Sequence, residues 1–385
     1  MTQHSRRHLL LVAVLGAAAL AITGCAPATT GPARSSTHGA AKHSPAPSAA
    51  PALDTAAPAP RLAIPCASLV PSAEISAYEG SVTLLQPSTI AAGDLSDSAG
   101  LIPTADYLRQ AGNIDCIWSA GPVDHYAQDS TSVSQYIEIT VQFDAASEWS
   151  ANAPGYGIDG DDGGECDVDA VGGQCLLDHL VGTGTWIEVS SRKAQGNDPD
   201  QIQNIMNSAV AAVTAAGTPA APTTTQTGTL PLGTNCTDFA TMASIQAAVG
   251  STGTVTASVL PSVPDDPTDI ANWSASENQL AARPCAFTSG AATQVQLAWL
   301  PGGAWAWAED KTQSLADVPL QSLTLTGLRA PDTAAIRCAT ANASCIVDLV
   351  LGGNWIEATV PTTSTAADRR TAAIAVAQAI VTKLS

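Results

Sequence analysis

Positively charged residues are scarce in this chain of 385 residues. Lys and Arg number 15 against 34 Asp and Glu, which gives a formal net charge of −19 at pH 7. The deficit is uneven, because residues 66–217 hold 21 acidic and 3 basic residues, whereas residues 230–385 hold 12 and 7. Binding to nucleic-acid phosphates requires clustered Lys and Arg, so we exclude nucleic acid as a partner.

Sequence motifs for catalysis are also missing. The chain has no Gly-x-Ser-x-Gly, no His-Glu-x-x-His and no Gly-x-x-x-x-Gly-Lys. Beyond residue 60 there are two histidines, His125 and His179, and His179 follows Asp178 in an expected strand, where neighbouring side chains point to opposite faces. We therefore expect neither an enzyme nor a cofactor. A hydrolase that uses His125 or His179 is the lesser alternative, because a catalytic triad forms in space rather than in sequence.

Long apolar runs are missing too, apart from one near the start of the chain. Leu9 to Ile22 is apolar, follows Arg6 and Arg7, and leads into small residues. The run is too short to span a bilayer comfortably, and its flanks have the layout of a secretory signal. We predict that residues 1–24 are a signal peptide.

The end of this segment predicts where the protein resides. Ile22-Thr23-Gly24-Cys25 resembles a bacterial lipobox, in which cleavage before the cysteine exposes a thiol that carries lipid. The resemblance implies acyl chains such as palmitate on Cys25, and a protein anchored at the extracytoplasmic face of the cell membrane. Each buried acyl CH₂ group contributes about 0.8 kcal/mol to membrane binding. Residues 5–10 also resemble a twin-arginine export signal, so both export routes stay open.

Residues 25–60 are rich in Ala, Pro, Ser and Thr and contain almost no large apolar side chain. Such a composition cannot bury enough surface to fold, so we expect a disordered tether. Extended at about 3.1 Å per residue, it reaches on the order of 100 Å from the membrane.

The eight cysteines after Cys25 fall into two similar sets. Their spacings are 50, 50 and 9 residues, then 49, 53 and 7, and the sets are Cys66, Cys116, Cys166, Cys175 and Cys236, Cys285, Cys338, Cys345. Similar spacing in two halves indicates a tandem duplication. We therefore divide the chain into a first repeat at 61–217, a linker at 218–231 and a second repeat at 232–385.

Disulfides explain an even set of cysteines outside the cytoplasm, and the chain has no Cys-x-x-Cys that would favour a metal. Four cysteines allow three pairings in each repeat. We favour the first with the second and the third with the fourth. The short last loop suits a hairpin, and the long first loop stabilises by about 4 kcal/mol in the chain-entropy model.

Hydrophobic periodicity predicts an α+β fold. Alternating apolar residues indicate strands, and apolar residues at helical spacing indicate a long helix near the end of each repeat. The expected strands are 136–143, 175–180, 185–190, 294–300, 345–350 and 354–360, and the expected helices are 200–216 and 366–384. Each repeat is thus expected to be an antiparallel sheet with a helix before it and a longer C-terminal helix after it.

Two equivalent strands carry candidate ligand-groove residues. In Trp186-Ile-Glu188 and Trp355-Ile-Glu357, strand alternation puts Trp and Glu on one face and Ile on the other. Trp beside a carboxylate could line a groove, the Trp stacking and the Glu accepting hydrogen bonds. The alternative is that the Trp packs beneath the terminal helix. Trp305 and Trp307 would form an apolar patch for a partner if both face solvent.

An acidic loop is the one candidate metal site. Asp159, Asp161 and Asp162 belong to a run of oxygen ligands and glycines that could hold Ca²⁺. The spacing does not match an EF-hand, because Gly163 and Ala170 occupy positions where carboxylates belong. We therefore favour a solvated acidic loop and expect no metal.

Each repeat resembles the actinobacterial lipoprotein family known as domain of unknown function 3558, and more distantly the disulfide-bonded extracellular sensor domains of some Ser/Thr kinases. The resemblance lies in a cysteine before a short helix that ends in Gly, in Cys116-Ile-Trp118, and in the late Gly-x-Trp strands. The chain differs in carrying two copies and in Phe287, where Trp is usual. The resemblance implies a class of envelope lipoprotein and no particular chemistry.

These observations favour a non-catalytic, lipid-anchored envelope protein that acts as a ligand-binding, sensing or interaction module. Its expected partners are the membrane, through the lipid on Cys25, and a small ligand or an envelope protein whose identity the sequence does not specify. A scaffold for cell-wall assembly is the alternative, in which the tether sets the reach.

Overall fold

The computed structural model describes residue 53 and residues 56–79, 83–84, 102, 104–119, 135–152, 162–166, 174–193, 198–222, 230–260, 279–311, 320–338 and 344–385. The expected signal peptide with Cys25, His125, Asp159 and Asp161 lie outside these residues, as does most of the expected tether. The described chain is a mixture of helices and antiparallel sheets, which confirms the α+β class.

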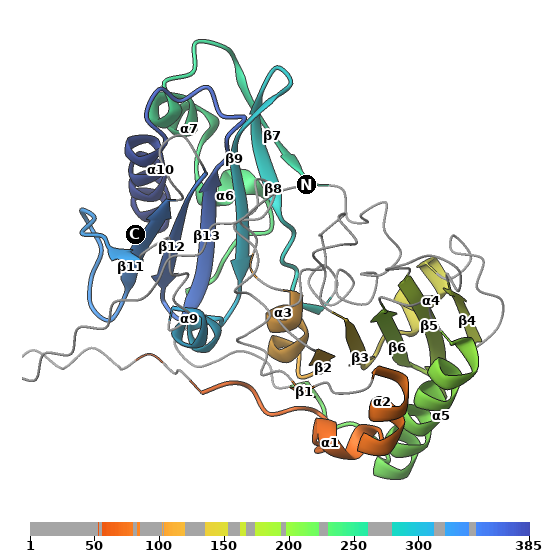
Figure 1. Cartoon of the computed structure of the whole chain (residues 1–385). Coiled ribbons are helices and arrows are strands. Elements are labelled where there is room, and N and C mark those ends of the chain that lie inside the picture. The colour runs from red at the N-terminus through yellow and green to blue at the C-terminus, as the bar shows by residue number, and fades with distance from the viewer. Residues whose placement is uncertain are drawn as a thin grey trace, which may run out of the picture. The chain divides into compact units, whose positions relative to one another are not determined.

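The first sheet has six strands in the order β1-β2-β3-β6-β5-β4, and every neighbouring pair is antiparallel (Figure 1). The strands are β1 (Thr83–Leu84), β2 (Ile114–Ser119), β3 (Tyr136–Gln142), β4 (Asp162–Cys166), β5 (Gln174–Val181) and β6 (Thr185–Arg192).

The second sheet has seven strands in the order β10-β11-β12-β13-β9-β8-β7, again antiparallel throughout. These strands are β7 (Val255–Val259), β8 (Cys285–Ser289), β9 (Ala292–Leu300), β10 (Gln321–Ser322), β11 (Thr333–Cys338), β12 (Cys345–Leu351) and β13 (Asn354–Val360). Read from β7, six of them follow the order of the first sheet, and β10 is an additional edge strand.

Three helices accompany one face of each sheet. In the first repeat they are α1 (Cys66–Leu69), α2 (Ser72–Glu79) and α5 (Pro199–Ala216), and in the second they are α6 (Cys236–Phe239), α7 (Met242–Val249) and α10 (Arg369–Leu384). The long helix α5 packs on β5 and β6, and α10 packs on β12 and β13 (Figure 1). Each sheet has a hydrophobic core between its strands and its long helix, where Ile187 in the first repeat and Ile356 in the second are fully buried.

The N-termini of the two long helices are capped in the same way. Asp198 accepts hydrogen bonds from the backbone N–H groups of Asp200 and Gln201, and Asp368 accepts them from Arg370 and Thr371. An N-cap carboxylate satisfies backbone donors that have no partner within the helix. The cap explains why α10 begins at Arg369 rather than at residue 366, as the periodicity suggested.

Three shorter helices complete the described fold, namely α3 (Thr104–Gln110), α4 (Ala146–Asn152) and α9 (Ala304–Asp310). Helix α4 follows β3 and α9 follows β9, so the two occupy equivalent places in the strand order. Trp305 and Trp307 lie on α9 and are buried, at 0% and 5% exposure. The idea that they form an exposed apolar patch is therefore wrong.

Four disulfides connect the cysteines in the pairs favoured from the sequence, Cys66–Cys116, Cys166–Cys175, Cys236–Cys285 and Cys338–Cys345. In each repeat the first bond ties the first helix to the second strand. The second joins residues directly opposite each other on adjacent antiparallel strands, β4 with β5 and β11 with β12.

Residues 50–385 form one compact unit that contains both sheets. Within the part of the chain that the structure describes, no helix has the length and apolar character needed to cross a membrane.

Candidate functional site

The Trp-x-Glu strands are β6 and β13, and each faces a strand that supplies an aspartate. Asp178 on β5 lies directly opposite Glu188, and Asp348 on β12 lies directly opposite Glu357. Opposed residues of an antiparallel pair point to the same face, so two carboxylates meet on the sheet face opposite the long helix. Adding the tryptophan two residues before each glutamate gives one Trp–Asp–Glu trio in each repeat.

A hydrogen bond fixes the tryptophan of each trio. The indole Nε1 of Trp186 donates to Asp178 Oδ1 at 2.7 Å, and Nε1 of Trp355 donates to Asp348 Oδ1 at 3.0 Å. In the second repeat a two-residue turn, Gly352-Gly353, sets the register, and both residues have positive φ, at 56° and 88°. Such φ values suit a tight hairpin turn and favour glycine.

A second tryptophan covers each trio. Trp149 on α4 makes an edge-to-face contact with Trp186 at 5.3 Å between ring centroids, and Trp307 on α9 contacts Trp355 at 5.7 Å. Trp186 and Trp355 are 0% exposed. Both aromatic rings of the trios thus pack beneath the short helix after the third strand rather than beneath the terminal helix.

The four ligand-groove candidates lie in the interior. Like the two tryptophans, Glu188 and Glu357 are buried, at 2% and 3% exposure. His179 lies on the other side of β5 from Asp178, because successive strand residues alternate, and it is partly exposed. Asp162 belongs to β4. Among the described residues no group of three or more His, Cys, Asp or Glu side chains is arranged to hold a metal ion.

Burial dominates the electrostatics of the first trio. It raises the pKa of Asp178 to about 7, and the hydrogen bond from Trp186 lowers that pKa in part. A carboxyl removed from water favours its neutral form, since ionisation in a low-dielectric interior is unfavourable. Burial in the first trio therefore favours a protonated carboxyl as pH falls towards neutrality and below.

The second trio differs because a buried arginine joins it. Arg337 Nη2 lies 2.9 Å from Asp310 Oδ2 on α9 and 3.5 Å from Asp348 Oδ2. Burial raises the pKa of Asp348 to about 6, against the opposing effect of Arg337, and burial together with Asp348 raises the pKa of Glu357 well above its usual value. Three carboxyl groups thus share one guanidinium in the interior.

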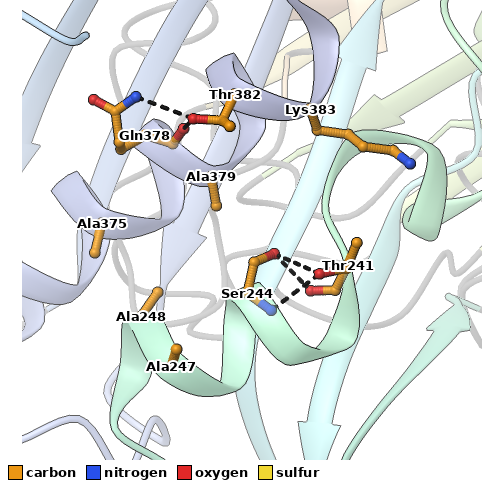
Figure 2. Close-up of a pocket in the computed structure, with 9 residues that line it drawn as sticks. All are labelled: Thr241, Ser244, Ala247, Ala248, Ala375, Gln378, Ala379, Thr382 and Lys383. Carbon is orange, nitrogen blue, oxygen red and sulfur yellow. Dashed lines mark hydrogen bonds between the residues drawn. The ribbon is translucent and has the colours of Figure 1, made fainter.

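An open groove lies elsewhere, between α7 and α10 (Figure 2). It has a volume of about 600 Å³ and is lined by Thr241, Ser244, Ala247, Ala248, Ala375, Gln378, Ala379, Thr382 and Lys383. Figure 2 shows the alanines on the facing sides of the two helices, with hydroxyl and amide groups around them. The groove thus combines a floor of methyl groups with a polar rim.

The corresponding helix pair of the first repeat is bridged by side chains. Counting from the first cysteine and from the N-cap aspartate of each repeat, Glu74 corresponds to Ser244, and Ser208 corresponds to Gln378. Ser208 Oγ donates to Glu74 Oε2 at 2.8 Å, which joins α5 to α2. Gln378 instead exchanges two hydrogen bonds of 2.8 Å with the backbone of Thr326. The groove thus lies where the first repeat has a side-chain hydrogen bond between its helices.

The trios and the groove were recognisable from the sequence to different degrees. The tryptophans and glutamates stood out as a repeated Trp-Ile-Glu motif, whereas Asp178 and Asp348 required the strand register that pairs them with the glutamates. The groove left a weaker signal, since its floor consists of alanines in a chain that contains many of them.

Comparison of this chain with family models, with curated proteins and with solved structures gives no match.

Proposed function

We propose that this chain is a lipid-anchored protein of the cell envelope, held through acyl chains on Cys25, whose folded part binds a ligand or partner rather than catalysing a reaction. The lipobox-like segment and the Pro-rich stretch after it support the anchor. The disulfides support an oxidising compartment, because such bonds persist outside the cytoplasm.

The groove between α7 and α10 is the observation that carries the binding role. Its volume of about 600 Å³ lies within the usual range of small-molecule sites, which are mostly apolar with a few polar groups. Its lining offers methyl, hydroxyl, amide and ammonium groups and contains no His, Cys, Asp or Glu. Such a lining suits reversible binding.

Native mass spectrometry of the protein extracted gently from its own envelope tests this role. We expect a mass above that of the lipidated chain under native conditions and its loss on denaturation. Ala247→Trp fills the groove, and Ala243→Trp places the same ring on an exposed position of α7 outside the lining. The extra mass should disappear in the first variant and persist in the second. Extra mass retained by Ala247→Trp, or none in the unmodified chain, would contradict binding of a small ligand in the groove.

The denatured spectrum tests the anchor independently. Four disulfides lower the mass by about 8 Da relative to the reduced chain, and acyl chains add masses spaced by CH₂ groups. Cys25→Ser should release the protein from the membrane fraction. A mature chain with an unmodified Cys25 would disprove the anchor and leave the groove proposal intact.

A further inference from the structure

Helix α3 follows β1 in the chain, yet one of its side chains belongs to the core of the second sheet. Tyr107 is 3% exposed and packs in the cluster that contains Trp299, Trp305 and Trp355. A large aromatic ring buried in this way contributes substantially to packing. The second core thus includes a residue that lies before the linker.

Arg109 provides the polar part of the same contact. Its guanidinium lies over the Trp305 ring, with Cζ 4.4 Å from the ring centroid. Its Nη1 and Nη2 donate to the two carboxylate oxygens of Glu309 at 2.9 and 3.3 Å, and Trp305 Nε1 donates to the side chain of Gln110. Bidentate pairing and ring stacking are the geometry for which arginine is suited and lysine is not.

A second contact joins the repeats in the opposite sense. Gln279, which precedes β8, accepts a hydrogen bond from Asn113 Nδ2 at 2.9 Å and donates through Nε2 to the Phe143 carbonyl oxygen at 2.7 Å. Asn113 Oδ1 in turn accepts from the Phe143 backbone N–H at 3.0 Å. Phe143 follows β3 directly, as the segment carrying α9 follows β9.

The two contacts use equivalent segments, with the roles of the first and second repeats reversed. In each, the segment before the second strand of one repeat meets the segment after the third strand of the other, since β2 and β3 correspond to β8 and β9. Reciprocal contact of equivalent surfaces characterises an isologous pair with two-fold symmetry. The second contact is the smaller, so the symmetry is approximate.

We infer that the two repeats form a reciprocal intramolecular pair, in which α3 docks on the α9 surface of the second repeat and joins both sheets into one cooperative unit. The surface formed by Trp305 and Glu309 is a binding site for a helix that presents Tyr, Arg and Gln, and its partner is α3 of the same chain. This inference is independent of the groove and of the lipid anchor.

Cleavage of the folded full-length chain tests the pair. A protease site inserted between residues 222 and 230 allows the linker to be cut after folding, and no disulfide then connects the halves. We expect the two halves to co-elute in size-exclusion chromatography under non-denaturing conditions. Halves of the otherwise unmodified chain that separate on cleavage would overturn the inference.

A charge reversal locates the contact. Arg109→Glu places two carboxylates face to face and should weaken association of the cleaved halves at least tenfold, whereas Arg329→Glu, at an exposed position, should leave it unchanged. Combining Arg109→Glu with Glu309→Arg should restore co-elution, which distinguishes a lost contact from a misfolded variant. Unchanged association in Arg109→Glu would show that α3 does not hold the repeats together.

Discussion

The two Trp–Asp–Glu trios have the same backbone register and differ in whether a buried arginine lies beside them. In the second repeat Arg337 compensates the buried carboxyl groups, with Asp310 and Asp348 as its partners. In the first repeat no salt bridge to Asp178 is found within the described residues, and the carboxyl favours its protonated form. A buried carboxyl can be accommodated by a counter-charge or by a proton; the second repeat combines Arg337 with raised carboxyl pKa values, whereas Asp178 in the first repeat favours a proton.

Removing the buried arginine of the second trio should give the largest loss of stability. Arg337→Leu leaves Asp310, Asp348 and Glu357 buried without their cation, and breaking a buried ion pair in this way costs about 3–5 kcal/mol. Urea unfolding at pH 7 measures the loss. Arg329→Leu is the control, since its side chain is exposed and a surface change of this kind stays within about 0.5 kcal/mol. A loss below 1 kcal/mol in Arg337→Leu would mean that the cluster is neutralised by protons in both repeats.

Replacing Asp178 or Asp348 by asparagine should change the pH dependence of stability to a different extent in the two repeats. The pKa of Asp178 is raised from 3.8 to about 7 in the folded chain, so the folded state holds the proton more tightly than the unfolded state. The stability that this proton provides is fully present below pH 3.8 and is lost as pH rises through 7. Relative to Asp178→Asn, the unmodified chain should therefore lose stability steadily between about pH 4 and pH 7.

Asp348→Asn provides the matched comparison. The pKa of Asp348 is raised only to about 6, so the stability difference between Asp348→Asn and the unmodified chain should stop changing at a lower pH and be smaller than for Asp178→Asn. Thermal unfolding from pH 4 to 8 measures both curves. Equal divergence in the two variants would show that Arg337 does not distinguish the repeats.

The contact between the repeats should weaken as pH rises from about 4 to 8. Burial raises the pKa of Asp106 on α3 to about 8, Arg109 lowers it, and Asp310, Glu309 and Asp115 raise it further. The contribution of the neutral carboxyl is fully present below pH 3.8 and is lost as pH rises from there through 8, because the ionised group repels Glu309 and Asp310. Association of the cleaved halves should weaken by up to tenfold per pH unit as pH rises from about 4 to 8 and should level off above 8, where the carboxyl is ionised in both states. Asp106→Asn should remove this dependence, and a pH-dependent loss that persists in the variant would assign the effect to another group.

The smallest expected difference concerns the covering tryptophans. Trp149→Phe and Trp307→Phe each keep an aromatic ring over the trio, so each should cost only about 0.5–1.5 kcal/mol. Since the centroid distances to Trp186 and Trp355 are similar, at 5.3 and 5.7 Å, the two losses should agree. Urea unfolding of both variants measures them. A loss several times larger at one position would mean that α4 and α9 have different roles.

The helices α4 and α9 and the burial of their tryptophans could not be predicted from the sequence. Trp149 and Trp307 occupy the same place in α4 and α9, but their neighbours differ too much for the correspondence to be seen in the sequence. The alternating positions of Trp305 and Trp307 do not indicate that both residues belong to a seven-residue helix and that both are buried. The alternation of side chains along a strand identifies which residues share a face of the sheet. It does not show whether other elements bury that face.

Local and near-local information determined part of the fold. The strands at 136–142, 174–181, 185–192, 292–300, 345–351 and 354–360 and the two long helices agree with the periodicity, and the four cysteine pairs agree with the pairing that loop length favoured among the three possible. These features depend on residues close in sequence or on a repeated pattern. The tertiary structure alone decided that the trios are interior, that Arg337 lies beside Asp310 and Asp348, and that Arg109 meets Glu309 across 200 residues. Such contacts depend on which faces pack together, and burial then changes the protonation of groups whose identity the sequence already specified.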